Sequence, residues 1–461
     1  MNNIDVSEVI DQSPVRPFHI FVLMLCTLCL IIDGFDVQAL GYGAPAIIRD
    51  WGVSKAEFGP VFGAGLLGMT FGALCLGVVA DKVGRRPVLI GALLFVAICS
   101  FGTIFASSIR DLLVLRFLTG LGMGAIIPNA IALAGEYSPG RIRVSLMMVT
   151  SSGFIVGGAV GGAIAAVLIP VFGWQSVFLA GAIAPLVLAI VMYFVLPESL
   201  QFMVLREKPA KRIVRALLRI APHQKLDANS TFIVRETRGK GVPLAQLFRN
   251  RMATGTLLLW IVNFMNLICA YFLANWLPIV MSDAGHGASQ AVLAGTTLWV
   301  GGILGNLLLG WFVDRHGFGP VMTAMFCVGS LSIAAIGQVA TSLPQALAVI
   351  AVAGFCVMGG QSALNALAAT YYPTAVRTTG IGWAMGIGRF GSILGPLVGG
   401  ELMRLSWPTS QLFIAAAVPT LIAVAASLVF WWKVKLQPSG LDKQRINLTD
   451  GVVIANAETL R

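Results

Sequence analysis

Residues 77–87, GVVADKVGRRP, decide the fold of this chain, because a related stretch, GWFVDRHGFGP, occupies residues 310–320 at a shift of 233 positions. Two more pairs of stretches repeat in the same order, with shifts of 234 and 238 positions: YSPGRIR at 137–143 with YYPTAVR at 371–377, and GFIVGGAVGG at 153–162 with GSILGPLVGG at 391–400. Three matches in one order at a nearly constant shift indicate an internal duplication. The sequence therefore predicts two halves of similar structure.

Between the repeated stretches lie long apolar runs, which are typical of a membrane protein. Of the 461 residues, 57% are hydrophobic and only 11% are charged, whereas a soluble domain carries about 25% charged residues. This composition excludes a soluble globular protein and a disordered one. The formal charge of +11 does not indicate nucleic-acid binding, because the basic residues lie between the apolar runs.

Twelve of these runs are long enough to cross a membrane as a helix, which takes about 20 mostly apolar residues. We place them at residues 18–42, 57–80, 87–106, 110–134, 145–169, 174–195, 253–280, 289–313, 320–341, 344–369, 378–402 and 409–432. The predicted fold is an all-α integral membrane protein in which twelve transmembrane helices form two pseudo-symmetric six-helix bundles. Two such bundles that face each other across a cavity can rock, which suits alternating access.

The basic residues predict the orientation of the chain. With the N-terminus inside, 25 of the 31 Lys and Arg residues fall in inner segments and four in outer loops, as the positive-inside rule requires. The predicted units are a cytoplasmic tail, a bundle, a cytoplasmic central loop, a second bundle and a second cytoplasmic tail, at residues 1–17, 18–196, 197–252, 253–432 and 433–461. The basic central loop is either a solvated linker or an amphipathic helix on anionic lipid.

Ionisable residues within the spans are costly and are therefore functional candidates. Asp33 and Asp36 are three positions apart, on one face of the first helix. Two carboxylates that close in a low-dielectric cavity do not both ionise readily, so one is expected to hold a proton near neutral pH. Asp36 and Arg116 each lie six residues, or about 9 Å, from the expected outer end of their helix, which permits an ion pair. Our hypothesis is that protonation of Asp36 frees Arg116 and gates the cavity; the alternative is a permanent structural bridge.

Arg389 lies near the expected bilayer centre, and its guanidinium can hold a carboxylate with two parallel hydrogen bonds. It either supports substrate binding or pairs within the second bundle. Amides and aromatic rings that suit a hydroxylated ring make up the rest of the candidate pocket: Asn263, Asn266, Tyr271, Trp276, Gln361, Asn365 and Trp383. Bundle packing or an interfacial belt explains any single aromatic residue better than a binding contact does.

These residues resemble those of a known family. GVVADKVGRR at 77–86 resembles the signature loop of the major facilitator superfamily, LRFLTGLG at 115–122 its fourth-helix motif, and PES at 197–199 a loop of sugar porters. DGFD at 33–36 is similar to the motif of the aromatic acid:proton symporters, and the resemblance covers about residues 15 to 435. It implies a monomeric carrier of the bacterial inner membrane that imports protons with an aromatic carboxylate such as benzoate or a hydroxybenzoate. It also implies a pair between a first-helix acid and a fourth-helix arginine.

The signature loop predicts a cytoplasmic gate. Gly77 and Gly84 allow a close helix approach and a tight turn, while Asp81 can accept hydrogen bonds at a helix N-terminus. In the superfamily that helix is the eleventh, so Asp81 is expected to latch the two bundles together. The charged partners in this gate are Arg85, Arg86 and Glu136 in the first half, and Asp314 and Arg377 in the second, where Phe318 and Gly319 replace the two arginines.

Several functions are disfavoured. The chain has no Gly-x-x-x-x-Gly-Lys-Ser/Thr loop for ATP, so no cofactor is expected and the proton gradient is the expected energy source. The four histidines are too scattered for a metal site, and no nucleophile is paired with a base as an enzyme requires. The alternatives are a carrier of the same fold for a muconate-like acid, a phenylpropanoate or a sugar, and a receptor or enzyme that does not transport.

Overall fold

The computed structural model describes residues 3–221, 231–233, 244–248, 252–372 and 376–435. Within these ranges, twelve helices are long and apolar enough to cross a membrane, which confirms the predicted number. The first six are α2 (Pro17–Trp51), α3 (Phe58–Val83), α4 (Arg85–Thr103), α5 (Ile109–Glu136), α6 (Arg143–Phe172) and α7 (Gln175–Val195). The second six are α10 (Met252–Asp283), α11 (Ala288–His316), α12 (Phe318–Val339), α13 (Leu343–Tyr371), α14 (Arg377–Arg404) and α15 (Thr409–Lys435).

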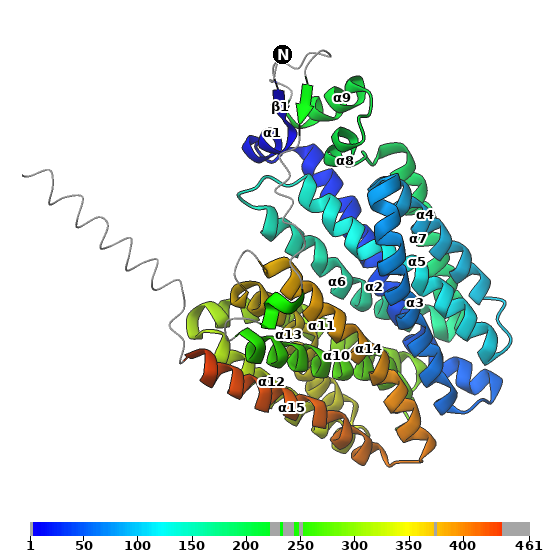
Figure 1. The fold of residues 1–461 in the computed structure, drawn as a ribbon. Coiled ribbons are helices and arrows are strands. Elements are labelled where there is room, and N and C mark those ends of the chain that lie inside the picture. The colour runs from blue at the N-terminus through cyan, green and yellow to red at the C-terminus, as the bar shows by residue number, and fades with distance from the viewer. Residues whose placement is uncertain (1–2, 222–230, 234–243, 249–251, 373–375, 436–461) are drawn as a thin grey trace, which may run out of the picture.

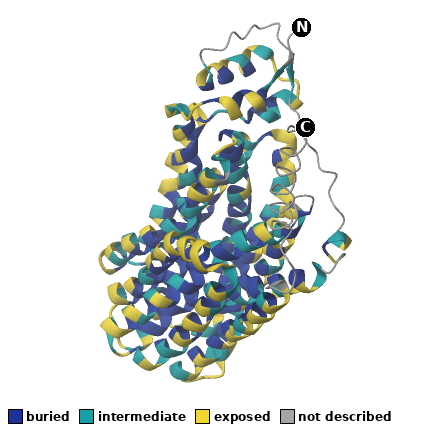
Figure 2. Ribbon diagram, turned by 90° about the vertical axis from the view of Figure 1, so that its left-hand side faces the viewer, coloured by how far each residue is buried: buried dark blue, intermediate teal, exposed yellow. Residues whose placement is uncertain are grey.

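Large apolar side chains cover the outward faces of these helices. On α7, Ile183, Val187, Ile190 and Phe194 are 50–78% exposed, each three or four positions from the next along one stripe. Figure 2 shows the same pattern over the molecule, with buried residues inside the bundles and exposed ones on their outer faces. Apolar stripes of this kind mark contact with another apolar phase, and here that phase is lipid.

The internal duplication is visible in the helix packing. A Cβ atom on Gly68 of α3 would lie 2.1 Å from the carbonyl oxygen of Phe117 of α5. At the corresponding place in the second half, a Cβ atom on Gly301 of α11 would lie 2.2 Å from the carbonyl oxygen of Ala351 of α13. These pairs are related by shifts of 233 and 234 positions, which are the shifts of the repeated motifs. Both halves therefore use glycine at the same point to bring the same two helices together.

The two bundles are inclined to each other, as Figure 1 shows for the blue-to-green and green-to-red halves. They converge where α3 meets α14, and a Cβ atom on Gly59 would lie 3.2 Å from Cα of Gly400. At this end Lys55, in the short helix η1 (Lys55–Glu57), pairs with Asp283 at 2.6 Å. Gln38 also donates a hydrogen bond to the backbone carbonyl of Ala274.

A small cap lies at the other end of the first bundle (Figure 1). It contains β1 (Asn3–Asp5), α1 (Val6–Gln12), α8 (Leu200–Leu205), α9 (Ala210–Ile220) and β2 (Thr231–Ile233). The short helix η2 (Leu244–Phe248) packs instead against α10 of the second bundle. β1 and β2 pair in parallel. α9 is amphipathic, and its apolar residues Ile213, Leu217 and Ile220 are buried within the protein, so this face is not available to lipid. The tail after residue 435 lies outside the described residues.

The first transmembrane helix is longer than the sequence predicts. The apolar run suggests an end near Tyr42, but α2 continues to Trp51 and ends at Gly52, whose φ of 63° is the left-handed conformation that glycine adopts readily. The added turns contain Arg49 and Asp50, so hydropathy alone does not include them. Asp36 thus lies about 22 Å from the helix end rather than the 9 Å estimated from the sequence.

The glycine packing leads to a test with a control on the same helix. Gly72 of α3 packs against α5, and a Cβ atom there would lie 2.0 Å from the carbonyl oxygen of Leu121; nothing lies within 4 Å of the Cβ position at Gly77. We expect Gly72→Val to force the helices apart and to lower stability by about 1–3 kcal/mol or more, while Gly77→Val has little effect. Thermal unfolding followed by size-exclusion chromatography in detergent measures this. Equal unfolding temperatures for the two variants would contradict the packing.

Candidate functional site

A buried ion pair joins two helices of the first bundle. Arg116 Nη1 of α5 lies 3.2 Å from Asp36 Oδ2 of α2, and the two side chains are only 5% and 2% exposed. Ser100 Oγ donates a hydrogen bond of 2.9 Å to the other oxygen of Asp36. Arg116 Nη2 donates one of 3.1 Å to Thr103 Oγ1, and the guanidinium lies 5.0 Å from the centre of the Phe178 ring. The predicted pair is therefore present, and every one of these partners belongs to the first bundle.

Asp33 is in a different situation, one helical turn away on α2. Its side chain is buried, and neither carboxylate oxygen has a hydrogen-bond partner among the described residues. The nearby charges that act on it are those of Asp36, on its own helix, and Arg389, on α14 of the second bundle. The charges of Asp33 and Arg389 also act on Tyr271 of α10. Asp33 is therefore buried within electrostatic range of a positive charge on the other bundle.

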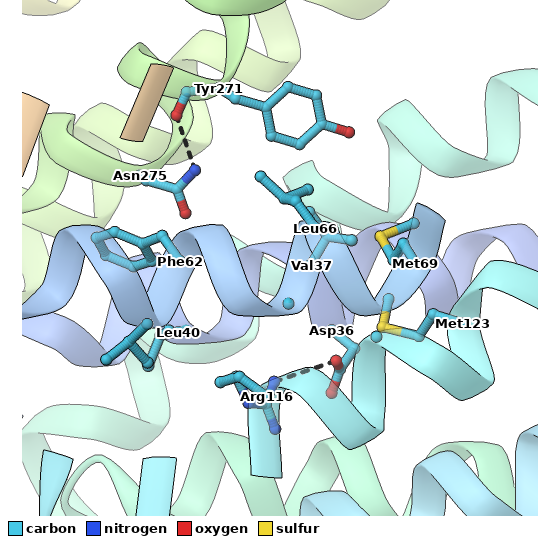
Figure 3. Close-up of a pocket in the computed structure, with 13 residues that line it drawn as sticks. Asp36, Val37, Leu40, Phe62, Leu66, Met69, Arg116, Met123, Tyr271 and Asn275 are labelled. Atoms are coloured by element: carbon cyan, nitrogen blue, oxygen red, sulfur yellow. Dashed lines mark hydrogen bonds and ion pairs between the residues drawn. The ribbon is translucent and has the colours of Figure 1, made fainter. Parts of the chain in front are cut away.

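A small cavity of about 30 Å³ lies beside Asp36. Asp36 and Arg116 line it from the first bundle, and Tyr271 and Asn275 line it from the second. Figure 3 shows Tyr271 and Asn275 on the opposite side of the pocket from the ion pair, and the apolar side chains of Phe62, Leu66, Met69 and Met123 around it. Its lining, apolar with a few convergent polar groups, resembles that of small-molecule sites.

Four predicted pocket residues form one hydrogen-bonded cluster, which we call the amide cluster: Asn263 and Asn266 of α10, and Gln361 and Asn365 of α13. Gln361 is at its centre. Its Nε2 donates to Asn263 Oδ1 at 3.0 Å and to Asn365 Oδ1 at 3.3 Å, and its Oε1 accepts from Asn266 Nδ2 at 2.9 Å.

Two predicted pocket residues lie apart from the amide cluster. Trp276 is buried ten positions beyond Asn266, where its Nε1 donates to the carbonyl oxygen of Pro396 and its ring meets Phe62 edge-on. Trp383 is 43% exposed and stacks on Trp260 with 6.0 Å between ring centroids. The structure does not bring these two rings together with the amides, because each already packs against another aromatic residue.

The signature loop forms a network within the first bundle. Arg85 Nε donates to Glu136 at 2.7 Å, and its Nη2 lies 3.9 Å from Asp81. Arg86 donates to the backbone carbonyl of Tyr193 and lies over its ring. Both predicted partners of the arginines therefore belong to Arg85.

Glu198 of the PES motif completes this network. Its Oε1 accepts hydrogen bonds from the backbone N–H groups of Arg85 and Arg86 at 3.0 and 3.2 Å, at the start of α4. Burial raises the pKa of this carboxyl, and the N–H donors oppose that rise. Gly84 adopts a φ of 116°, as expected for a tight turn, and a Cβ atom there would lie 2.4 Å from Glu198 Oε2. The PES motif alone does not indicate this role for Glu198.

The expected latch between bundles is not formed in this conformation. The side chain of Asp81 is 73% exposed, and its ion pair is with Arg85 of its own bundle. Asp314 and Arg377 in the second half are also exposed, and Arg377 donates to the carbonyl oxygen of Tyr372. Nothing approaches within 4 Å of the Cβ position at Gly77, so the close helix contact expected there is absent. The reason is that the bundles diverge towards this end of α3 (Figure 1).

Sequence analysis missed four residues that shape the site: Ser100, Thr103, Phe178 and Asn275. Ser100 and Thr103 are three positions apart on α4, as Asp33 and Asp36 are on α2. Hydroxyl side chains also bond to the backbone of their own helix, as Thr103 does to Cys99, so this spacing alone does not identify a partner for Asp36.

Comparison with known proteins agrees with this architecture. The family model of the Major Facilitator Superfamily matches residues 26–317 and 259–449, and the chain belongs to this family of membrane transporters. A solved structure of a D-xylose-proton symporter is similar in fold, with a TM-score of 0.68 over 90% of this chain and 97% of that one, at 16% identity. The chain is therefore a multi-pass membrane transporter and not an enzyme.

Relatives with named functions give a more specific comparison than the family as a whole. The chain is 39% identical to the 4-hydroxybenzoate transporter PcaK of Pseudomonas aeruginosa, over 93% of this chain and 96% of the relative. It is 40% identical to the gallate transporter of Pseudomonas putida, over 92% of this chain and 94% of that protein. These similarities identify it as a relative of aromatic acid transporters.

The enclosed ion pair predicts a stability effect. Removal of one member leaves the other charge buried and unpaired, which costs about 3–5 kcal/mol, whereas removal of both is much less harmful. We expect Arg116→Gln to lower the unfolding temperature strongly, and the double variant Asp36→Asn with Arg116→Gln to recover most of the loss. Thermal unfolding in detergent tests this. A single variant as stable as the unsubstituted protein would show that the pair is not needed to neutralise Asp36.

Proposed function

We propose that this protein is a proton-coupled symporter that imports an aromatic carboxylate by alternating access across the bacterial inner membrane. The observation that carries the proposal is the buried carboxyl of Asp33, which has no hydrogen-bond partner in the described chain and lies within electrostatic range of Arg389 on the opposite bundle. The names of the relatives support the choice of substrate class. The proposed transporter is a monomer without a cofactor, with both termini cytoplasmic as the basic residues favour.

Arg389 is the proposed anchor for the substrate carboxylate. It is half-buried, and its guanidinium has no ion pair within 4.0 Å among the described residues. A guanidinium stays charged and offers two parallel donors to a carboxylate. The ring is then expected to occupy the apolar space beside Tyr271, between the bundles.

A co-transported proton makes the uptake of an anion favourable. Entry of one negative charge against an inside-negative potential costs about 2.3 kcal/mol per 100 mV. One proton per molecule cancels this charge and adds the energy of the pH gradient. A carrier with a single titrating acid is therefore sufficient.

Asp33 is the better placed of the two acids to carry that proton. Asp36 is held by Arg116 and Ser100, whose helices move with its own bundle, so rocking does not separate it from these two partners. The counter-charge of Asp33 is on α14 of the other bundle, so rocking does change its surroundings. A substrate carboxylate on Arg389 also removes the charge that offsets an ionised Asp33. Both effects favour protonation of Asp33 when substrate binds. The Asp36–Arg116 pair is then assigned a structural role.

The direction of opening fits this mechanism. The bundles meet at the ends that hold Lys55 and Asp283, which are outer segments in the orientation that we propose. They diverge at the end that holds Asp81, which would then be the cytoplasmic side. The latch between Asp81 and the start of α14 is proposed to close when the carrier opens outward.

Substitution of the two acids separates their roles. We expect Asp33→Asn to lose accumulation driven by a proton gradient while it retains exchange of labelled for unlabelled substrate, because the amide mimics the protonated acid. Asp36→Asn is expected to weaken accumulation and exchange together, because it disturbs the fixed pair. Uptake and counterflow of labelled 4-hydroxybenzoate in proteoliposomes measure both. Full gradient-driven accumulation by Asp33→Asn would refute the assignment.

Arg389 offers a second test. Arg389→Gln is expected to raise the KM for the aromatic acid about tenfold or more, because it removes a charge-assisted carboxylate contact. Arg389→Lys keeps the charge without the paired donors, so its KM is expected to lie between those of the unsubstituted protein and Arg389→Gln. Initial uptake rates over a range of substrate concentrations provide the values. An unchanged KM in Arg389→Gln would place the carboxylate elsewhere.

A further inference from the structure

We infer that the amide cluster recognises a ring hydroxyl of the substrate and that Asn266 Oδ1 is the atom that accepts its hydrogen bond. This inference rests on the proposed function and makes it more specific, because it selects hydroxylated aromatic acids among aromatic carboxylates. It follows from the number and direction of the hydrogen bonds in the cluster.

The side-chain amides of Asn263, Gln361 and Asn266 can each be oriented in only one way, because backbone carbonyls at the two ends of this chain of hydrogen bonds accept but cannot donate. Asn263 Nδ2 donates to the backbone carbonyl of Leu259 at 3.0 Å, so Asn263 Oδ1 is the atom that faces Gln361. An oxygen there requires Gln361 to present Nε2 to it, and Gln361 Oε1 then faces Asn266. Asn266 Nδ2 donates to this oxygen and also to the backbone carbonyl of Val357 at 3.2 Å. Backbone carbonyls cannot donate, so the assignment holds at both ends of the chain of bonds.

One acceptor is left over. Asn266 is fully buried, and its Oδ1 has no hydrogen-bond donor among the described residues. A buried acceptor without a donor is unfavourable, so this position calls for a donor that these residues do not supply. A phenolic O–H is such a donor, whereas an unsubstituted ring, a fluoro substituent and a methoxy substituent are not.

Asn266 lies on α10, the helix that packs against the α14 helix of Arg389. α14 packs on α10 at this level, since a Cβ atom on Gly388 would lie 3.7 Å from Asn263 Cβ. Asn266 is one helical turn further along α10, about 4.5 Å by the helical rise. Arg389, the residue after Gly388, and Asn266 therefore lie on neighbouring helices at similar levels along them.

Hydroxyl recognition and proton coupling use different side chains in the two halves of the chain. Asn263 and Asn266 have the same three-residue spacing in the second half as Asp33 and Asp36 in the first, at a shift of 230 positions. Carboxylates at these positions would also accept a hydroxyl bond, but they would titrate. Amides accept it at every pH at which the carrier works.

A competition experiment tests the inference. Counterflow of labelled 4-hydroxybenzoate in proteoliposomes is measured against benzoate, the three hydroxybenzoates, and the fluoro and methoxy acids of matching position. We expect at least one hydroxybenzoate to compete about tenfold better than its fluoro and methoxy counterparts, because only the hydroxyl donates to Asn266. In Asn266→Leu this advantage should fall to about twofold or less. Asn306→Leu removes an amide outside the cluster, one that donates to Ser152, and should keep the advantage.

The outcomes separate the two proposals. Failure of the unsubstituted protein to transport any of these acids would refute the proposed function. Transport of all of them with equal apparent affinity, or an undiminished hydroxyl advantage in Asn266→Leu, would refute the inference and leave the proposed function intact. Size-exclusion chromatography confirms that each variant is folded. If Asn266→Leu is not folded, Asn266→Ala removes the same acceptor with a smaller side chain.

Discussion

The burial of Asp33 between the two bundles is the constraint on which the proposed mechanism depends. An ionised carboxylate without hydrogen bonds in a low-dielectric interior is strongly disfavoured, and Asp33 has no bonding partner among the described residues. Its compensating charge, Arg389, is on the other bundle. The charge state of one side chain is thereby linked to the relative position of two large bodies, which is what coupling between a proton and a conformational change requires.

The duplicated scaffold carries different chemistry in its two halves. Helix packing is repeated closely, as Gly68 and Gly301 show by bringing equivalent helices together. The polar residues are not repeated: acids occupy the first helix of one half, while amides with the same three-residue spacing occupy another level of α10, the first membrane helix of the second half. Proton binding and substrate recognition are thus assigned to separate bundles, and the pocket between them is where the two meet.

Sequence reasoning predicted the features that depend on local pattern. The number of spans follows from apolar runs, the turn at Gly84 from the need for an unusual φ, and the Asp36–Arg116 pair from the cost of charge in a membrane. The pair was found although the depth estimate for Asp36 was too small. Its helix extends into polar residues that hydropathy does not count, but both members still needed a partner.

Features that depend on packing between distant segments were not accessible in this way. The hydroxyls of α4 that bind Asp36 and Arg116 look like any hydroxyls in a span. Trp276 and Trp383 have the right chemistry for a pocket but pack against other aromatic rings. The exposure of Asp81 reflects the angle between the bundles, and that angle is a property of the conformation rather than of the sequence around it.

The most direct measurement is infrared difference spectroscopy of the purified transporter with and without 4-hydroxybenzoate, which observes carboxyl protonation itself. If Asp33 takes up the proton, substrate binding near neutral pH produces a new band for a protonated carboxylic acid, and this band is absent in Asp33→Asn but present in Asp36→Asn. A band that persists in Asp33→Asn and disappears in Asp36→Asn would contradict it and would assign the proton to the arginine-paired acid.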